Sequence, residues 1–279
     1  MPTRTNATRD GILLDPQRFA EHAALSRPSC HPALNTWVEN YWTVRWTLRA
    51  GASYSPSLVP IAQANLTVES GGSTRVGADG PGVFLTGVVS ARRFDVHLSG
   101  TGGIAGVKFR PGALTALTGV DATRLRDRVV PARVFLADVD QLADVRAGSA
   151  ELAERFDGFL MPLARRADPA ELDTLAAVIA TLEASEPSMS AADLADRCGI
   201  GLRSLQRLCR HYVGVGPQWL VARARVHTAI ARLHAGDVGT LAGLAVELGW
   251  FDQAHMGRDF AALVGEPPAT YRRRAGRDP

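Results

Sequence analysis

The sequence predicts an α+β protein in which a β-rich, barrel-like or sandwich-like N-terminal domain, followed by helices, precedes an all-helical C-terminal domain. Two observations support this class. Short runs with alternating apolar residues, separated by glycine-rich turns, occupy residues 34–110, whereas helical periodicity begins after Pro111. In addition, the last third of the chain contains one helical pattern twice. The length of 279 residues suits two domains.

Composition shifts divide the chain into four predicted segments. A polar tail with one short helix near Pro16–Ala24 comes first, and proline-containing stretches at Arg165–Pro169 and Ser185–Ser188 flank the connection between the domains. The predicted segments are 1–33 for the tail, 34–165 for the β-rich domain with its C-terminal helices, 166–187 for the linker and connecting helix, and 188–275 for the helical domain of two repeated units.

Residues 42–48 carry the clearest strand pattern. Trp42, Val44, Trp46 and Leu48 alternate with threonine and arginine, and this period of two predicts a strand with one buried face. Stretches rich in glycine at 70–73 and 78–82 are predicted turns. Further strand-like runs are Leu58–Ile61, Asn65–Glu69, Val83–Val89, Arg93–Leu98 and Gly103–Phe109.

After Pro111 the apolar residues recur at helical spacing. In 149–163, for example, Leu152, Phe156 and Phe159 fall on one face. The helices predicted before the last third of the chain are Gly112–Leu117, Asp138–Val145, Ser149–Leu163 and Pro169–Ala184.

The last third of the chain holds an internal repeat. Ala195 and Ala245 lie 50 positions apart, as do Gly199 and Gly249. The pairs that lie 51 apart are Leu205 with Met256, Cys209 with Phe260, Gly214 with Gly265, and Pro217 with Pro268. A duplication with one extra residue just after the glycine explains both offsets.

Each copy has the spacing of a helix-turn-helix. The alanine lets the second helix approach closely, the glycine takes the left-handed conformation that ends the first helix, and the large apolar residue plugs the second helix into the core. Ser190 with Asp193 predicts a capping box for the first unit, and Asp252 is placed to cap the last helix. A helix over Pro217–Ala235 would space the two units.

Residues from about Met189 to Arg274 resemble the DNA-binding domain of AraC-type transcription regulators. The matching motifs are Ser204-Leu205-Gln206-Arg207-Leu208, Gly214-x-x-Pro217, Arg225-x-x-x-Ala229, Ala245-x-x-Leu248-Gly249-Trp250, Asp252-Gln253-x-His255, Phe260, and Gly265-x-x-Pro268-x-x-Tyr271-Arg272. Three residues depart from the family pattern. Trp250 and Cys209 are predicted to be core substitutions, whereas Phe251 is expected to alter the entry to the last helix.

The N-terminal part bears a weaker resemblance to a sensor domain found in that family. Glu39-Asn40-Tyr41-Trp42 and Gly106-Val107-Lys108-Phe109-Arg110-Pro111-Gly112 carry it. The family's sensors are β-rich and vary in ligand, so the resemblance implies a β-rich, sensor-like domain at 34–165.

The resemblance implies a sequence-specific transcription regulator with two helix-turn-helix units. The second helix of each unit would enter one of two adjacent major grooves of double-stranded DNA. On the first recognition helix, about Leu202–Tyr212, arginine suits guanine and glutamine suits adenine, while Arg210 is placed for phosphate. On the second, about Asp252–Leu263, the outward set is less polar, and His255 is expected to be partly structural. The predicted DNA-binding residues are Arg203, Ser204, Gln206, Arg207, Arg210, Gln253, His255, Arg258 and Arg272. Arg272–Arg274 form either a phosphate clamp or a disordered basic tail.

The charge distribution agrees with an anionic partner for the last third. Residues 187–279 hold 12 Arg against 8 acidic residues, a net charge of +4, while residues 1–186 carry −1. Of the 31 basic residues all but Lys108 are arginine, which indicates mainly a codon bias.

The N-terminal domain shows no catalytic motif, so the sequence predicts that the chain is no enzyme and uses no cofactor. His97 stands alone in its strand and Cys30-His31 lacks partners at ligand spacing, so no metal site is predicted. Two interpretations remain for the aromatic residues of the N-terminal domain. They either pack a core, which is the interpretation we favour, or they line a ligand site. The residues of that ligand site would be Trp42, Trp46, Tyr54, Phe94 and His97.

The predicted partners are therefore double-stranded DNA and a small-molecule effector, with RNA polymerase and a second copy of the chain also compatible. The alternative function is a small-molecule-binding or enzymatic β-domain protein whose helical part makes protein contacts. The N-terminus lacks a signal-peptide core and no apolar run reaches about 18 residues, so a cytoplasmic protein without membrane contact is expected.

Overall fold

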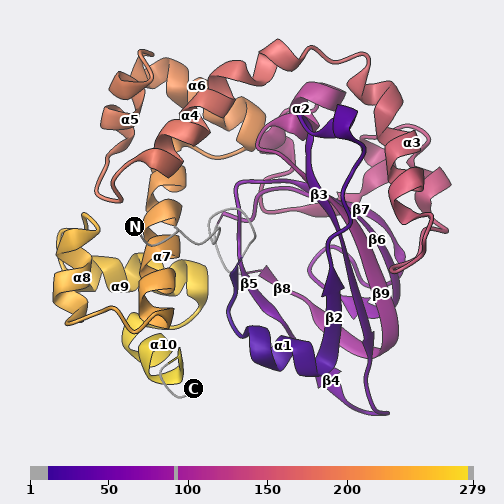
Figure 1. Cartoon of the computed structure of the whole chain (residues 1–279), viewed down its shortest axis with the longest axis horizontal. Coiled ribbons are helices and arrows are strands. Elements are labelled where there is room, and N and C mark those ends of the chain that lie inside the picture. The colour runs from indigo at the N-terminus through magenta and orange to yellow at the C-terminus, as the bar shows by residue number, and fades with distance from the viewer. Residues whose placement is uncertain (1–11, 91–93, 276–279) are drawn as a thin grey trace.

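The computed structural model describes residues 12–90 and 94–275 (Figure 1). A β-rich domain with helices at one end occupies one side of the molecule, and a group of helices that surrounds the long helix α7 occupies the other (Figure 1). The predicted α+β class is therefore confirmed. Within the described residues no helix is long and apolar enough to cross a membrane.

Two antiparallel sheets build the β-rich domain. The larger sheet has the strand order β10-β7-β6-β9-β3-β2, with β4 paired to β9, and the smaller sheet has the order β1-β5-β8. The strands are β1 (Ile12–Leu13), β2 (Ala23–Ser26), β3 (Val38–Thr47), β4 (Ser53–Tyr54), β5 (Ser57–Val59), β6 (Asn65–Thr74), β7 (Gly82–Thr86), β8 (Phe94–Asp95), β9 (His97–Phe109) and β10 (Val129–Pro131).

The predicted strand runs all overlap strands of the structure, although Arg93 at the start of one run lies outside the described residues. The predicted turn at 70–73 is wrong, because these residues belong to β6. The strand continues through a β-bulge at Gly71, where φ is +78° and the register against β9 shifts. A Cβ at Gly71 would clash with the carbonyl oxygen of Thr101, so the glycine serves the bulge rather than a turn.

The predicted N-terminal tail contains its expected helix, α1 (Pro16–His22), but also the strands β1 and β2. Three of the four residues of β2 are exposed, so their sequence shows no alternation that could predict a strand. Its pairing with β3 also explains why Thr43 is only 3% exposed, since the Ser26 and Thr43 hydroxyls hydrogen-bond at 2.7 Å. The polar face of β3 is thus buried at Thr43 alone, since Arg45 and Thr47 on the same face stay exposed, as the alternating sequence predicts.

Apart from β10, the regular elements after β9 are helices joined by loops. The predicted helix at 138–145 is only a short 3-10 helix, η4 (Val139–Leu142), and a second, η5 (Pro169–Leu172), precedes α4. The α-helices after β9 are α2 (Ala113–Thr118), α3 (Leu152–Ala164), α4 (Asp173–Ala184), α5 (Ala191–Arg197), α6 (Leu202–Val213), α7 (Pro217–His234), α8 (Leu241–Glu247), α9 (Gln253–Val264) and α10 (Pro268–Ala275).

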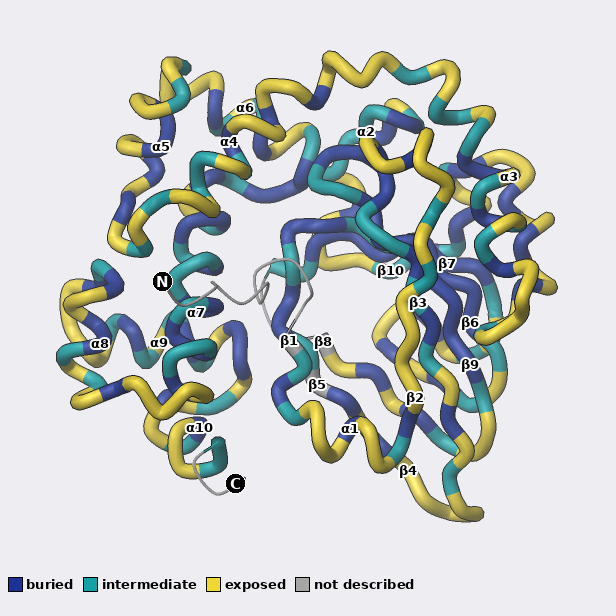
Figure 2. Tube along the Cα trace, in the orientation of Figure 1, coloured by how far each residue is buried: buried dark blue, intermediate teal, exposed yellow. Residues whose placement is uncertain are grey.

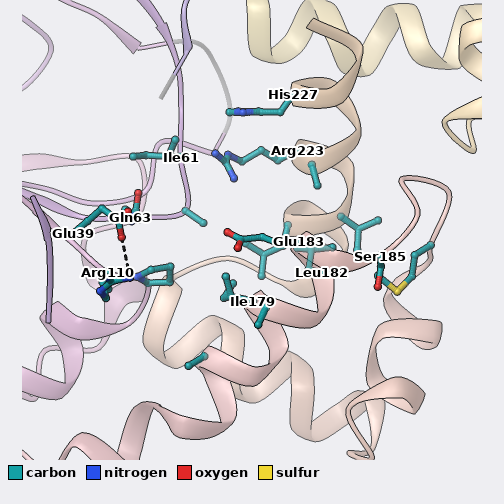
Figure 3. A pocket seen from close by; sticks show the side chains of 18 of the residues that line it. Glu39, Ile61, Gln63, Arg110, Ile179, Leu182, Glu183, Ser185, Arg223 and His227 are labelled. Carbon is teal, nitrogen blue, oxygen red and sulfur yellow. Dashed lines mark ion pairs between the residues drawn. The ribbon is translucent and has the colours of Figure 1, made fainter. Parts of the chain in front are cut away.

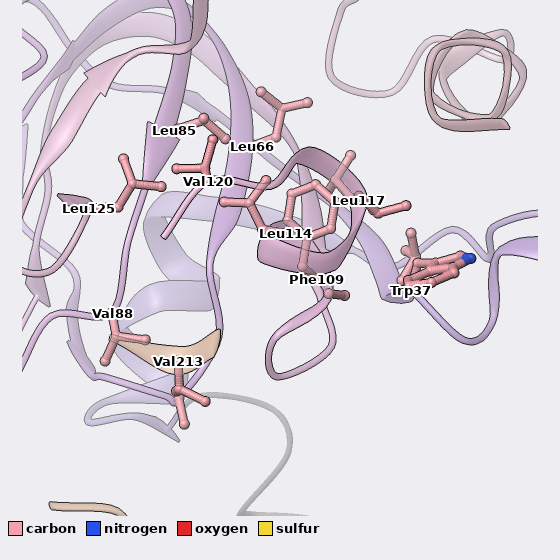
Figure 4. Packing of buried hydrophobic residues seen from close by; sticks show 14 of the residues in the cluster. Trp37, Leu66, Leu85, Val88, Phe109, Leu114, Leu117, Val120, Leu125 and Val213 are labelled. Carbon is pink, nitrogen blue, oxygen red and sulfur yellow. The ribbon is translucent and has the colours of Figure 1, made fainter. Parts of the chain in front are cut away.

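The largest buried cluster crosses from the β-rich domain into the first helical unit. Figure 2 shows the central strands β6, β7 and β9 buried along most of their length. Figure 4 shows Val213 of α6 beside Val88 of the β-rich domain, and both belong to this cluster together with Leu205 and Cys209. The first helical unit therefore shares its core with the N-terminal domain.

The second helical unit has a cluster of its own. Met256, Phe260 and Tyr271 are fully buried there, and the cluster also takes in Leu14 and Val59 from the N-terminal part. Each helical unit is thus packed against a different region of the β-rich domain.

Candidate nucleic-acid interface

Both repeated units fold as helix-turn-helix pairs, α5 with α6 and α8 with α9. The alanines and apolar plugs that the repeat identifies are at most 1% exposed: Ala195, Ala245, Leu205 and Met256. Gly199 and Gly249, with φ of +65° and +81°, take the predicted left-handed conformation between the two helices. These local predictions from the repeat are confirmed.

Side-chain caps fix where the helices begin. The Asp193 amide donates to Ser190 Oγ at 3.2 Å, and the Ser190 amide donates to Asp193 Oδ2 at 2.9 Å, which completes the predicted capping box. The His255 amide donates to Asp252 Oδ1 at 2.6 Å and starts α9. The second recognition helix is therefore held at its N-terminus as predicted.

Ser190→Ala is expected to lower the free energy of unfolding by about 1 kcal/mol, because the first unit loses its N-cap. Hydrogen bonds from the Ser190 backbone and side chain lower the pKa of Asp193. A carboxyl group whose pKa is lowered in the folded state stabilises the fold at pH values above its ordinary pKa of about 4. This contribution is lost as the pH falls through the lowered pKa. Urea titrations at pH 7 and pH 3 should show a smaller difference between wild type and variant in acid. Ser204→Ala, an exposed serine inside α6, is the matched control and should change stability by less than about 0.5 kcal/mol.

The outward face of α6 is rich in arginine. Arg203, Arg207 and Arg210 are exposed, as is Ser204, and Gln206 is half-buried. Within the described residues none of the three guanidinium groups has a hydrogen bond or an ion pair. The opposite face is buried through Leu205, Cys209 and Val213. α6 is therefore held by the core while its predicted base-contacting side chains face solvent.

The outward face of α9 offers fewer donors. Gln253 and Arg258 are exposed, whereas His255 Nε2 lies 3.6 Å from Asp259 Oδ2. The same Asp259 oxygen accepts a hydrogen bond from the indole of Trp250 at 2.8 Å. His255 thus lies next to an acceptor within the protein, which agrees with the expectation that its role is partly structural.

Of the residues that depart from the family pattern, Trp250 and Cys209 are buried in the cores, as predicted for core substitutions. Phe251 is 88% exposed and directly precedes Asp252, the cap of α9. An exposed phenylalanine at this point adds an apolar contact group beside the polar face of α9.

The arginines at 272–274 have hydrogen-bond partners inside the protein. Arg272 donates to the carbonyl oxygens of Val238 and Gly239 at 3.1 and 3.3 Å. Arg274 pairs with Glu266 at 2.7 Å and donates to the Leu14 carbonyl at 3.1 Å. Residues 268–275 form α10, so the alternative of a disordered basic tail is wrong for this stretch.

The predicted ligand residues of the β-rich domain do not share one place. Trp42 lines a cavity of about 200 Å³ between the sheets, and its indole donates to Asn65 Oδ1 at 3.2 Å. Trp46 and Tyr54 do not line this cavity and belong to a small apolar cluster, against which Trp42 also packs. His97 Nδ1 lies 3.1 Å from Ser55 Oγ. The side chain of Phe94 lies outside the described residues.

Three charged residues that are not among the predicted ligand residues line the same cavity. Glu69, Arg75 and Lys108 are at most 8% exposed. Arg75 forms an ion pair with Glu69 and donates to Thr86 Oγ1 at 2.7 Å. In the sequence, the one sign of a buried charged site is a charged residue within a predicted strand, as at Glu69 and at the single lysine, Lys108. Within residues 12–90 and 94–275, no group of three or more His, Cys, Asp or Glu side chains could hold a metal ion.

Comparison with known proteins identifies two regions. Residues 27–131 match a family described as a domain of unknown function (DUF6597), and residues 194–274 match the family of helix-turn-helix domains. A curated relative from Streptomyces lividans, named as an AraC-like transcription regulator, is 31% identical over 86 residues. This match covers 31% of the chain and 28% of the relative, so the chain matches less than a third of the relative's length.

Solved structures with similarity to the chain include AdpA and ToxT. The DNA-binding domain of AdpA in complex with a target DNA is 27% identical, covers 38% of this chain and 97% of its own, and has a TM-score of 0.35. ToxT from Vibrio cholerae, in a structure with an unsaturated fatty acid bound, is 12% identical, with coverage of 90% and 94% and a TM-score of 0.41.

Proposed function

We propose that this chain, whose residues 194–274 form an AraC-type helix-turn-helix domain, is a sequence-specific transcription regulator that reads two adjacent major grooves of double-stranded DNA. The observation that carries the proposal is the outward face of α6. It presents three exposed guanidinium groups, with no partner among the described residues, on the second helix of a helix-turn-helix. A solvated arginine face on an isolated helix would not support this function, but the same face on a recognition helix does.

The side chains of α6 divide by position along the helix. Arg203, Gln206 and Arg207 would meet base edges, because arginine binds guanine and glutamine binds adenine through two hydrogen bonds. Ser204 lies among them, and Arg210, near the helix C-terminus, would contact phosphate. On α9 the contacts would come from Gln253 and Arg258, with a smaller part for His255.

The separation of the two units suits two successive grooves. Helix α7 has 18 residues and is therefore about 27 Å long, and it contacts α5 and α6 of one unit and α9 and α10 of the other. Successive major grooves on one face of a duplex lie about 34 Å apart. A spacer of this length keeps the units apart without a partner chain.

Modulation by a small-molecule effector, or by dimerisation through the N-terminal domain, belongs to the same proposal. Both helical units pack against the β-rich domain, and cavities of about 540 and 200 Å³ adjoin or lie inside that domain. A ligand that reshapes either cavity would act on the surfaces that position α6 and α9.

Binding of the full chain to duplex DNA should weaken steeply with salt. If about six phosphates are neutralised, the plot of log K against log salt concentration has a slope of roughly −5, since each phosphate contributes about 0.9. Selection of bound sequences from a random duplex pool, followed by fluorescence anisotropy from 50 to 300 mM salt, measures both specificity and slope. Absence of binding at the lowest salt would contradict the proposal and favour a role in protein contacts for the helical part.

A further inference from the structure

The two repeated units differ in the turn that joins their helices. After the left-handed glycine of the first unit, the Ile200 amide donates to the Ala195 carbonyl oxygen at 3.1 Å. After that of the second unit, the Trp250 amide donates to the Ala245 carbonyl oxygen at 2.9 Å. The two bonds close the same helix end, so Ile200 and Trp250 are equivalent residues and the extra residue of the second copy follows Trp250.

Phe251 is that extra residue. In the first unit Gly201, the N-cap of α6, comes directly after Ile200. In the second unit Phe251 lies between Trp250 and Asp252, the N-cap of α9. The second copy therefore has a longer turn, and the residue that lengthens it is a phenylalanine at the start of the recognition helix.

Among the described side chains, the ring of Phe251 is the most exposed large apolar group. It is 88% exposed, compared with 72% for Val76 and 68% for Val246. A single exposed apolar residue is common on a protein surface and by itself indicates no partner. Phe251 is a special case because of what holds its neighbours and because of the helix that it precedes.

The chain on each side of Phe251 is anchored to the protein. Trp250 is 3% exposed, and its indole donates to Asp259 Oδ2 at 2.8 Å. Asp252 accepts a hydrogen bond from the His255 amide at 2.6 Å and so caps α9. The phenyl ring is therefore presented to solvent by a turn whose two ends are held in place.

The chemistry of the major groove determines which group this ring can meet. The N-terminal residues of a recognition helix contact base edges there, and Phe251 directly precedes these residues of α9, among which Gln253 and Ala254 are exposed. A phenyl ring offers no hydrogen bond to a phosphate or a polar base edge, whereas the C5-methyl group of thymine is the apolar group that bases display in the major groove. Insertion of an apolar side chain between base pairs is typical of the minor groove instead. The ring therefore suits a thymine methyl group.

We propose that Phe251 determines sequence specificity by contacting the C5-methyl group of a thymine in the major groove that α9 enters. This role rests on the proposed function. Phe251 and Gln253 are two positions apart, which is at most about 7 Å along the chain, and stacked base pairs are about 3.4 Å apart. The thymine therefore lies within about two base pairs of the position that Gln253 reads.

Uracil scanning of a duplex selected by the full chain tests this contact. Each thymine is replaced in turn by deoxyuridine, which keeps the base pair and lacks only the C5-methyl group, and the dissociation constant is measured by fluorescence anisotropy. We expect one replacement, close to the position whose preference Gln253→Ala loses, to weaken binding of the wild type about three- to fourfold, the factor for one methyl group returned to water. In Phe251→Ala the same replacement should have almost no effect, because the partner of the methyl group is already absent.

The unmodified duplex separates this contact from charge and from folding. Phe251→Ala should bind it about three- to tenfold more weakly than the wild type, with an unchanged salt slope because no charge is removed. Phe251→Leu keeps an apolar group at the position and should retain part of the uracil effect. Val246→Ala truncates another exposed apolar side chain of the same unit, on α8, and as the matched control should change neither affinity nor preference. Circular dichroism verifies that each variant is folded.

The thymine contact is refuted if no thymine responds to uracil in the wild type, or if Phe251→Ala responds as the wild type does. Equal affinity and equal sequence preference of Phe251→Ala and the wild type would also refute it and favour a contact of the ring with another protein. Failure of the wild type to bind any duplex would refute the proposed function together with the contact, whereas specific binding without a uracil effect would refute the contact alone.

Discussion

Phe260→Ala is expected to lower the free energy of unfolding by about 3–5 kcal/mol, the usual cost of removing a fully buried aromatic side chain. Phe260 is 0% exposed and packs edge-to-face on Tyr271, with ring centroids 5.5 Å apart. It belongs to the cluster that also contains buried residues of α7, and α7 and α9 are in contact. Urea titration followed by circular dichroism measures the loss.

Phe251→Ala is the matched control for this experiment. It removes the same side chain nine positions earlier, where the ring is 88% exposed. We expect a change of less than about 0.5 kcal/mol, since the ring buries little surface against the protein. Equal losses in the two variants would show that α9 does not rest on the core through Phe260.

The helical domain could be predicted closely because its signals are local. The left-handed glycine, the small alanine and the apolar plug lie within a few residues of one another, and they occur twice. Ser190 and Asp193, which form the capping box, are three positions apart. Chemistry of this kind is encoded in short stretches and needs no knowledge of the rest of the fold.

The β-rich domain was less predictable because its determinants are distant in sequence. β2 is a strand only because it pairs with β3, and the glycines at 71 and 72 make a bulge only because β9 passes beside them. The ion pair between Glu69 and Arg75 joins two residues six positions apart, on either side of that bulge. Periodicity reports which residues prefer burial but not which strand will cover them.

The candidate sites also divide into one that local sequence predicts and one that depends on residues distant in sequence. The exposed residues of α6 follow from the helical spacing of Arg203, Arg207 and Arg210. In contrast, the burial of Arg223 is set by Pro60, which lies 163 positions earlier. In the sequence Arg223 lies between two alanines, and nothing there distinguishes it from a solvent-exposed arginine of a helix. Its burial beside the cavity of about 540 Å³ could therefore be recognised only in three dimensions (Figure 3).

Arg207→Ala is expected to remove discrimination at one base pair of the bound sequence and to cost about 1–3 kcal/mol of binding free energy on the preferred duplex. Arg207 is exposed near the middle of α6, on the helix face opposite the buried Leu205 and Cys209. A guanidinium there can bind both guanine acceptors, and alanine can replace neither hydrogen bond. Stability should be unaffected because the described residues offer this side chain no partner. Footprinting and selection from a random pool would show the lost preference directly.

Arg210→Ala separates base reading from charge. This residue lies one turn closer to the C-terminus of α6, where we expect contact with phosphate. Its loss should weaken binding to all sequences alike and reduce the magnitude of the salt slope by about 0.9, with the selected sequence unchanged. Arg133→Ala, an exposed arginine of the β-rich domain, should change neither property. If Arg207→Ala behaved as we expect of Arg210→Ala, with preference retained and the slope reduced, α6 would bind the backbone only, and the reading of sequence would have to come from α9.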